Sequence, residues 1–436
     1  MKIGFVGCGY VFDHYMTTRS RHPGLTFAGV TDIDRARAER VGAYYRLRVY
    51  GSTEEMLADP EIAIIANLTS IGSHHTVSRA ALEAGKHVYS EKPLTPTLDE
   101  ARDLVALAAS KGLRLSAAPS NALSRTVQTM WSVVEQGVVG DVRLVYAEFD
   151  DNPVYLLAPE TWASRSGAPW PYLHEYEMGC TWEHAGYHLS WMCAIFGPVR
   201  RLTAFSKHTL PDKSPLPLDP PDTPDFSVAV LDFESGVVGR LTFSIAAPVD
   251  HRMRIIGNRG EVSTETYRHY EAPVRLDSFH PFSLKARNAA SVRRHAALGA
   301  LFGAGGRKVP LVRTALTAVS RDEIAGRGPK AWLRRWRRAE FGQQDKCLGL
   351  AELADAITVN RPHFPAPDFI LHVTELTLAI QAAGPEGSGY TPTTRFEPLS
   401  RPDGSERPPR YADWAAPGPL PRLLSGLLGR VGARRS

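Results

Sequence analysis

The chain of 436 residues is long enough for two or three domains, and its composition is that of an ordinary globular protein. Its formal net charge is +5, and its four cysteines are scattered, with no Cys-x-x-Cys pair. This spacing argues against a thiolate metal site and a disulfide scaffold, and it favours a reducing compartment, so we expect a cytoplasmic protein. No run of eighteen apolar residues predicts a membrane span, and residues 3–6 already form a core strand pattern, so we expect no cleavable leader.

Up to about residue 120, short apolar runs alternate with amphipathic segments. The runs predict buried strands at Lys2–Val6, Leu25–Thr31, Ile62–Leu68, His87–Ser90 and Leu113–Ala117. The segments between them predict helices near Val11–Arg21, Arg35–Ala43, His74–Ala84 and Thr97–Ser110. Because strands that alternate with helices need crossover connections, residues 1–121 are predicted to form an α/β domain with a parallel, doubly wound sheet.

The pattern changes after residue 121. A helix over Leu123–Gln136 is followed by strand-like runs, which are Val142–Phe149, Val199–Phe205, Phe226–Phe233, Val237–Ile245 and Met253–Ile256. The turn Glu234-Ser235-Gly236 joins two of these runs as a hairpin, which favours an antiparallel sheet. With helices near Asp345–Thr358 and Ile370–Ala382, residues 122–397 are predicted to form an α+β domain with a mainly antiparallel sheet. Residues 398–436 are expected to be a flexible tail rich in Pro and Arg.

A glycine-rich turn follows the first strand. Gly7 and Gly9 stand between that strand and a helix, and Phe12 occupies the position of the third glycine of a G-x-G-x-x-G turn. The first glycine permits the tight bend and the second lets the backbone approach a pyrophosphate. The free N–H groups of Tyr10 and Val11 open the helix, where an anion is favoured. The context predicts a Rossmann domain that binds a dinucleotide.

Asp32 ends the second strand, twenty positions after Phe12. A carboxylate at this spacing accepts hydrogen bonds from a ribose diol. It would repel a 2′-phosphate, so NAD is favoured over NADP, although Arg35 and Arg37 are close enough to leave NADP possible.

The string from Glu83 to Leu94, EAGKHVYSEKPL, together with the glycine turn, resembles the Gfo/Idh/MocA family of oxidoreductases. The resemblance covers most of the chain outside residues 281–338 and the tail. It implies that Lys92, before Pro93, lies at the centre of hydride transfer, where an ammonium can stabilise a developing alkoxide. Four further residues follow strand ends of the first domain and are expected to contact the cofactor. They are Thr69, His74, Glu91 and Asn121.

The family's second motif, Asp-x-x-x-His, falls on His184 and His188. By resemblance, His188 is the general base that takes the hydroxyl proton. His184 replaces the family's Asp, and three interpretations of it stay open. It is a substrate contact, with Glu183 or Glu177 supplying the charge, or it binds a divalent metal together with His188 and a Glu, or it is structural. We favour the substrate contact and assign no metal.

Two other segments are candidates for binding. The loop from Asp151 to Tyr176 is either a substrate wall or a packed loop. Its candidate side chains are Trp162, Arg165, Trp170, Tyr172 and His174. The insertion at about 281–338 holds fourteen basic residues between Lys285 and Arg338 against two acids, which suggests an anionic partner. No nucleic-acid fold motif accompanies it, so no nucleic acid is expected. The tail near 420–431 could make weak, peripheral membrane contact.

These features lead to one expected function and two alternatives. We expect an NAD(P)-dependent oxidoreductase that acts on a hydroxyl or ketone of a sugar, a sugar derivative or a cyclitol. The first alternative is a redox-neutral glycosidase or isomerase that keeps NAD tightly bound, and the second is a non-catalytic nucleotide-binding regulator. The resemblance also implies a homo-oligomer.

Overall fold

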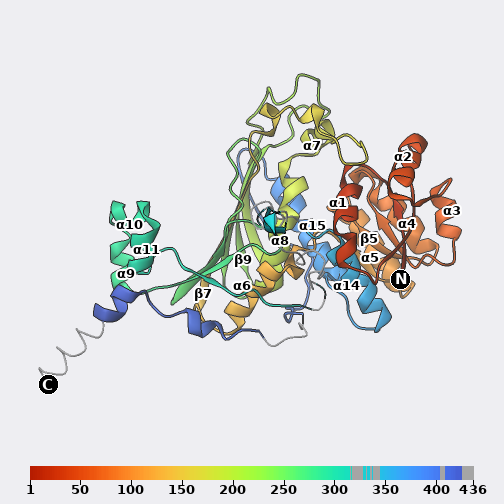
Figure 1. Cartoon of the computed structure of the whole chain (residues 1–436). Coiled ribbons are helices and arrows are strands. Elements are labelled where there is room, and N and C mark those ends of the chain that lie inside the picture. Colours follow the sequence, from red (N-terminus) through yellow and green to blue (C-terminus); the bar gives the residue numbers. More distant parts are fainter. Residues whose placement is uncertain are drawn as a thin grey trace, which may run out of the picture.

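The computed structural model describes residues 1–314, 316, 328, 329, 331–333, 336, 344–402 and 408–424. Two sheets organise this part of the chain, and they stand side by side with helices packed between and around them (Figure 1). The smaller sheet belongs to the N-terminal part of the chain and the larger sheet to the rest.

The N-terminal sheet has six parallel strands in the order β3-β2-β1-β4-β5-β6. The strands are β1 (Lys2–Val6), β2 (Thr26–Thr31), β3 (Arg48–Val49), β4 (Ile64–Asn67), β5 (His87–Ser90) and β6 (Leu115–Ala117). The order reverses direction at β1, so the carboxyl ends of β1 and β4 flank a topological switch point, where ligands bind in such sheets. The predicted doubly wound α/β fold is confirmed.

Helices cover both faces of this sheet. They are α1 (Tyr10–Thr18), α2 (Arg35–Tyr45), α3 (Thr53–Ala58), α4 (His74–Glu83) and α5 (Leu98–Ser110). Two apolar clusters, one centred on Phe5 and Tyr15 and the other on Ile65 and Leu104, fill the two layers. The short elements β3 and α3 escape prediction because neither carries enough apolar residues to form a periodic pattern.

The second sheet has nine strands in the order β14-β13-β12-β11-β7-β10-β9-β8-β15. They are β7 (Val142–Asp150), β8 (Val199–Lys207), β9 (Phe226–Phe233), β10 (Val238–Ser244), β11 (Met253–Gly257), β12 (Gly260–Thr264), β13 (Val274–Ser278), β14 (Arg307–Val309) and β15 (Ser388–Tyr390). All pairs are antiparallel except β7 with β10, so the predicted mainly antiparallel sheet is confirmed. Gly236, with φ of 82°, makes the predicted hairpin turn between β9 and β10.

Besides the short helices of the basic insertion, five described helices accompany this sheet. They are α6 (Arg125–Glu135), α7 (Tyr172–Met178), α8 (Cys180–Phe196), α14 (Cys347–Thr358) and α15 (Pro367–Gln381). Helices α8 and α15 pack on each other and on one face of the nine-stranded sheet. Helix α14 instead returns to the first domain, where Cys347 and Leu350 join the apolar cluster around Phe5. Helix α14, more than 300 residues after Phe5 in the sequence, therefore completes the core of the first domain.

The described part of the basic insertion forms α9 (Pro281–Ala286), α10 (Ala290–Arg294), α11 (Ala296–Phe302) and strand β14. These helices project at the far end of the second sheet from the first domain (Figure 1). Most of the arginine-rich run at 332–338 and the tail after residue 424 lie outside the described residues, while residues 419–424 are helical. In the ranges given above, no helix is long and apolar enough to cross a membrane.

Candidate active site

The glycine turn leaves an open cradle at the start of α1. Gly7 has φ of 86°, and a Cβ on it would lie 2.7 Å from the carbonyl oxygen of Leu68, so only glycine fits. Gly9 is the N-cap of α1 and makes no side-chain cap, and a Cβ on it would meet nothing within 4 Å. The N–H groups of Tyr10 and Val11, in the first turn of the helix, have no partner within the helix and are available to bind a pyrophosphate.

Phe12, at the position of the third glycine, is completely buried. Its ring packs edge-to-face on Phe5 with 5.3 Å between centroids. An aromatic contact thus replaces the close helix–sheet approach that glycine would allow.

Asp32 lies directly beside this turn. One carboxylate oxygen accepts a hydrogen bond from the backbone N–H of Cys8 at 2.9 Å, and the other accepts from the N–H of Asp34 at 2.9 Å. Arg37 is 3.5 Å away. The structure therefore places Asp32 at the turn, as its spacing predicts. A carboxylate still has acceptor capacity after two such bonds, so its position fits a ribose contact.

Thr69 and His74 follow β4. The Thr69 hydroxyl donates to Asn67 Oδ1 at 2.7 Å and is partly exposed. His74 is buried, with Nδ1 at 2.7 Å from the Pro93 carbonyl and Nε2 at 3.1 Å from the Thr69 carbonyl. Through these contacts His74 links the segment after β4 to the segment after β5. Both of its ring nitrogens are engaged, so neither is free to contact a cofactor.

Glu91 and Lys92 follow β5, with a cis peptide between Lys92 and Pro93. The buried Glu91 carboxylate accepts a hydrogen bond from the Tyr15 hydroxyl at 2.8 Å, and it forms an ion pair with Lys346 at 3.3 Å. Burial opposes ionisation of Glu91, but Lys346 and Lys92 outweigh it and hold the pKa of this carboxyl below its usual value.

Lys92 crosses from the first domain to α8, where its ammonium forms an ion pair with Glu183. Burial alone would lower the pKa of Lys92, but the charge of Glu183 outweighs burial and raises it, so the lysine is an ammonium at neutral pH. Behind this pair, burial and then the charge of Glu183 raise the pKa of Glu175 to about 8. Lys92 keeps two further N–H donors for a bound oxygen.

His188, on α8, is completely buried. The Trp191 indole N–H donates to Nδ1 at 3.0 Å, and Nε2 lies 2.9 Å from the Glu148 carbonyl. Because an indole nitrogen can only donate, Nε2 carries the ring proton and gives it to that carbonyl. Burial lowers the pKa of His188 to about 3. Both nitrogens are therefore engaged, and these contacts do not support the predicted role of His188 as the base.

His184 is half-buried on the same helix face. Its Nδ1 lies 2.8 Å from the Cys180 carbonyl, and its ring stacks on Phe149 with 4.0 Å between centroids. Burial lowers the pKa of His184 to about 3. Within the described residues, no group of three or more His, Cys, Asp or Glu side chains could hold a metal ion. A shared metal would also need a free nitrogen on His188.

Tyr187 is the residue that the sequence did not single out. Its hydroxyl lies 3.4 Å from Lys346 Nζ, and the ammonium groups of Lys346 and Lys92 lie 5.8 Å and 5.9 Å from its ring centroid. Glu183 and Tyr187 are i, i+4, so they share the helix face that meets Lys92. This i, i+4 pair begins one position before the pair of histidines, and it is the sequence pattern that could have identified Tyr187 as a site residue.

Asn121 lies behind α8 and is fully buried. Its side-chain amide donates to the Tyr187 carbonyl, and its oxygen accepts from the Ser190 hydroxyl at 2.6 Å. The residue therefore fixes the position of α8 beside the first domain.

The loop between β7 and α7 reaches across to the first domain and lies near α1 (Figure 1). Ser164 and Ser166 donate their hydroxyl protons to Asp13 Oδ2 at 2.6 Å and 2.7 Å, and the N–H of Ser166 donates to Oδ1 at 3.0 Å. The rings of Trp162 and Trp170 pack together with 4.9 Å between centroids. The predicted substrate wall is thus anchored on the helix that follows the glycine turn.

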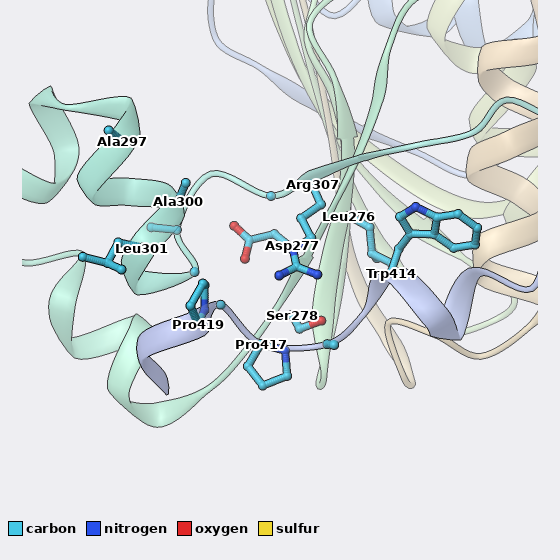
Figure 2. A pocket seen from close by; sticks show the side chains of 15 residues that line it. Leu276, Asp277, Ser278, Ala297, Ala300, Leu301, Arg307, Trp414, Pro417 and Pro419 are labelled. Atoms are coloured by element: carbon cyan, nitrogen blue, oxygen red, sulfur yellow. The ribbon is translucent and has the colours of Figure 1, made fainter. Parts of the chain in front are cut away.

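A separate hollow lies at the far end of the second sheet. Asp277 and Arg307 point into it, between α11 and the segment that carries Trp414 and Pro417 (Figure 2). None of the predicted site residues lines it. The two domains' facing residues, rather than this hollow, therefore form the candidate active site.

Comparisons with known proteins agree with this geometry. Residues 1–118 match the model described as "Oxidoreductase family, NAD-binding Rossmann fold", and residues 127–263 match the "GFO/IDH/MocA C-terminal domain". The chain is similar to trans-1,2-dihydrobenzene-1,2-diol dehydrogenase of Bos taurus, with 28% identity over 272 residues, 60% of this chain and 72% of the relative. The resemblance read from the Glu83–Leu94 string is confirmed.

Two solved structures share the fold. Aldose-aldose oxidoreductase from Caulobacter crescentus has a TM-score of 0.64 at 17% identity, over 90% of this chain and 99% of that one. The WlbA dehydrogenase from Bordetella pertussis, in complex with NADH and UDP-GlcNAcA, has a TM-score of 0.60 at 16% identity, over 87% of this chain and 94% of that one.

Proposed function

The chain belongs to the GFO/IDH/MocA family and is an NAD(P)-dependent dehydrogenase with an NAD-binding Rossmann domain, and we propose that its substrate is a sugar, a sugar derivative or a cyclitol. The observation that carries this proposal is the convergence of Lys92 and Tyr187. One comes from the carboxyl end of β5 and the other from α8, and both lie at the junction of the two domains.

The cofactor site follows from the residues already described. Gly7, Gly9, Tyr10 and Val11 hold the pyrophosphate through backbone groups, and Asp32 accepts hydrogen bonds from the ribose diol. Its carboxylate favours NAD, and the nearby Arg37 guanidinium leaves NADP possible. Thr69 and Glu91 follow the carboxyl ends of β4 and β5, where they would contact the bound dinucleotide. His74 and Asn121 are buried, bind backbone carbonyls, and support these strand ends without contacting the dinucleotide.

The chemistry is clearest for ketone reduction. A dinucleotide held at the Gly7–Val11 turn would supply the hydride that the carbonyl carbon accepts. Lys92 donates a hydrogen bond to the carbonyl oxygen and stabilises the negative charge that develops there. Tyr187 transfers its hydroxyl proton to the same oxygen, which completes the alcohol. Alcohol oxidation uses the same groups in reverse.

The two histidines receive other roles in this proposal. His188 is structural, because its ring nitrogens bind Trp191 and Glu148. His184 contacts a substrate hydroxyl through Nε2, since only Nδ1 is engaged by the helix backbone. On this face of α8, the negative charge comes from Glu183 and not from a carboxylate at position 184.

The charges of the site support a neutral, polyhydroxylated substrate. Lys92 is paired with Glu183 and Lys346 with Glu91, and Arg268 beside His184 is paired with Asp151. The opposite charges within each pair cancel. These residues therefore offer hydrogen-bond donors and acceptors to a substrate without a net charge. The dihydrodiol and the aldose in the names of two relatives are neutral compounds with more than one hydroxyl group.

Two wider properties belong to the same proposal. All four cysteines are buried and unpaired, which supports a reducing, cytoplasmic environment. Val230 and Val238 are exposed on the face of the second sheet opposite α8, which supports a homo-oligomer formed through that face.

The test is to purify the protein, release any bound nucleotide, and follow absorbance at 340 nm with a panel of sugars, cyclitols and dihydrodiols. Net NADH formation with NAD, or consumption with the matching ketone, supports the dehydrogenase. Bound nucleotide that cycles without net accumulation indicates a redox-neutral enzyme instead. A protein that binds NADH and turns over nothing in the panel contradicts the proposed function.

A further inference from the structure

Lys346 is a buried cation that the chemistry proposed above does not use. It stands immediately before α14, and only 12% of its side chain is exposed. Its ammonium reaches Glu91 Oε1 at 3.3 Å and Tyr187 Oη at 3.4 Å. The ion pair with Glu91 offsets the cost of burying the charge. The contact with the tyrosine is not needed for that purpose, so it requires another explanation.

The direction of the hydrogen bond to Tyr187 is fixed by chemistry. An ammonium has only donors, so Tyr187 Oη accepts from Lys346 and its own hydrogen must point elsewhere. In the described part of the chain, no acceptor protein atom is hydrogen-bonded to that hydroxyl hydrogen. A 3.4 Å contact can tighten when substrate binds. Lys346 thus leaves the Tyr187 proton free to face the substrate oxygen.

Lys346 is itself held in place from the nucleotide-binding helix. Tyr15, on α1, donates to the same Glu91 oxygen at 2.8 Å. Burial opposes the charge on Lys346, but Glu91 and then Tyr187 outweigh it and raise the pKa of the ammonium. The cation therefore persists through neutral pH, and it lies beside the oxygen that becomes negative when Tyr187 gives up its proton.

We propose that Lys346 is a positioning residue for proton transfer, which orients the Tyr187 hydroxyl and stabilises the phenolate left after the proton moves. The inference rests on the proposed function. It makes α14, a helix from the far end of the chain, part of the active site. Lys92 and Lys346 then have separate tasks, because Lys92 acts on the substrate oxygen and Lys346 acts through Tyr187.

A double-mutant cycle tests this proposal, because it separates a role through Tyr187 from a structural role. The variants are K346M, K346R, Y187F and K346M/Y187F, with K308M on the exposed strand β14 as the matched control. We expect K346M to lower kcat by about tenfold or more, which is part of the roughly hundredfold or larger contribution of general acid–base catalysis, while the Kd for NADH stays within twofold. K346R should recover part of kcat, and K308M should match the wild type.

The decisive comparison is made in the Y187F background. There, K346M should change kcat by less than twofold. An equal loss from K346M in both backgrounds, or a K346M enzyme with the wild-type kcat, would overturn the inference. If K346M does not fold, K346Q takes its place in the same cycle. A wild-type protein that turns over no substrate refutes the proposed function, and the inference with it, whereas an active wild type with an additive cycle refutes the inference alone.

Discussion

Lys92 forms an ion pair with Glu183, and this contact joins the carboxyl end of β5 in the first domain to α8 in the second. The pair holds the ammonium beside the Tyr187 ring. Because a lysine retains two donors after one ion pair, the contact orients Lys92 without consuming it. The two domains therefore build one reaction centre.

Lys92→Met should reduce kcat by about a thousandfold, because the substrate oxygen loses its charged donor. The Kd for NADH, measured by fluorescence, should change by less than threefold. Lys111→Met is the control, since Lys111 is exposed and its ammonium donates to the Glu83 carbonyl, away from the site. Full activity in Lys92→Met would remove the residue from the reaction.

Replacing His188 should affect stability. His188→Ala leaves the Trp191 indole N–H and the Glu148 carbonyl without partners and opens a cavity in the core, so we expect a loss of roughly 3 kcal/mol in the free energy of unfolding. Urea denaturation measures this loss. A variant with unchanged stability and abolished turnover would instead identify His188 as the base.

The contacts of Asp13 predict the behaviour of the loop at 151–171. Asp13→Asn removes an acceptor for Ser164 and Ser166, so the loop should detach from α1 and become a site of rapid limited proteolysis. Asp99→Asn is the control, because that carboxylate is 94% exposed. Equal cleavage rates in Asp13→Asn and the wild type would show that the loop is held by other contacts.

Glu175 predicts a pH dependence of stability. Its pKa is raised to about 8 in the folded protein, so its protonated form is favoured by folding. This contribution is complete below the unfolded pKa near 4.5 and is lost as pH rises toward 8. Glu175→Gln keeps a neutral side chain, so its Tm should fall less than that of the wild type between pH 5 and 9, by a few degrees. Parallel Tm curves would contradict the raised pKa.

Asp32 predicts the choice of cofactor. Asp32→Ala removes a carboxylate that would repel a 2′-phosphate, and Arg37 remains 3.5 Å from the vacated position. The ratio of NADPH affinity to NADH affinity should rise by about tenfold or more. Titration of both nucleotides by fluorescence measures it, and an unchanged ratio would place Asp32 outside the ribose site.

The sequence was sufficient to predict the elements that carry strong patterns. The alternation up to residue 121 predicted the parallel sheet, and the Glu91-Lys92-Pro93 segment predicted the position of Lys92. It was not sufficient to predict the rotation of α8. Glu183 with Tyr187, and His184 with His188, are both i, i+4 pairs, and the sequence does not show which pair faces the first domain. Contacts with β7 decide between them: the His184 ring stacks on Phe149, His188 binds the Glu148 carbonyl, and Tyr187 is turned toward Lys92.

Lys346 illustrates a second limit of prediction from sequence. It is separated from Glu91 by 255 positions, and no local pattern connects them. Only the return of α14 to the first domain brings the two together, and that return depends on burial of Cys347 and Leu350 among residues of the N-terminal sheet. Tertiary packing, rather than local propensity, assembles this part of the site.

The most direct test of the central claim compares Tyr187→Phe with His188→Asn in one assay. Both variants must first show folded circular dichroism spectra and wild-type affinity for NADH, and reduction or oxidation is then followed at 340 nm with the substrate found for the wild type. The account predicts that Tyr187→Phe loses at least a hundredfold in kcat, whereas folded His188→Asn stays within tenfold. A fully active Tyr187→Phe beside an inactive, folded His188→Asn would contradict it.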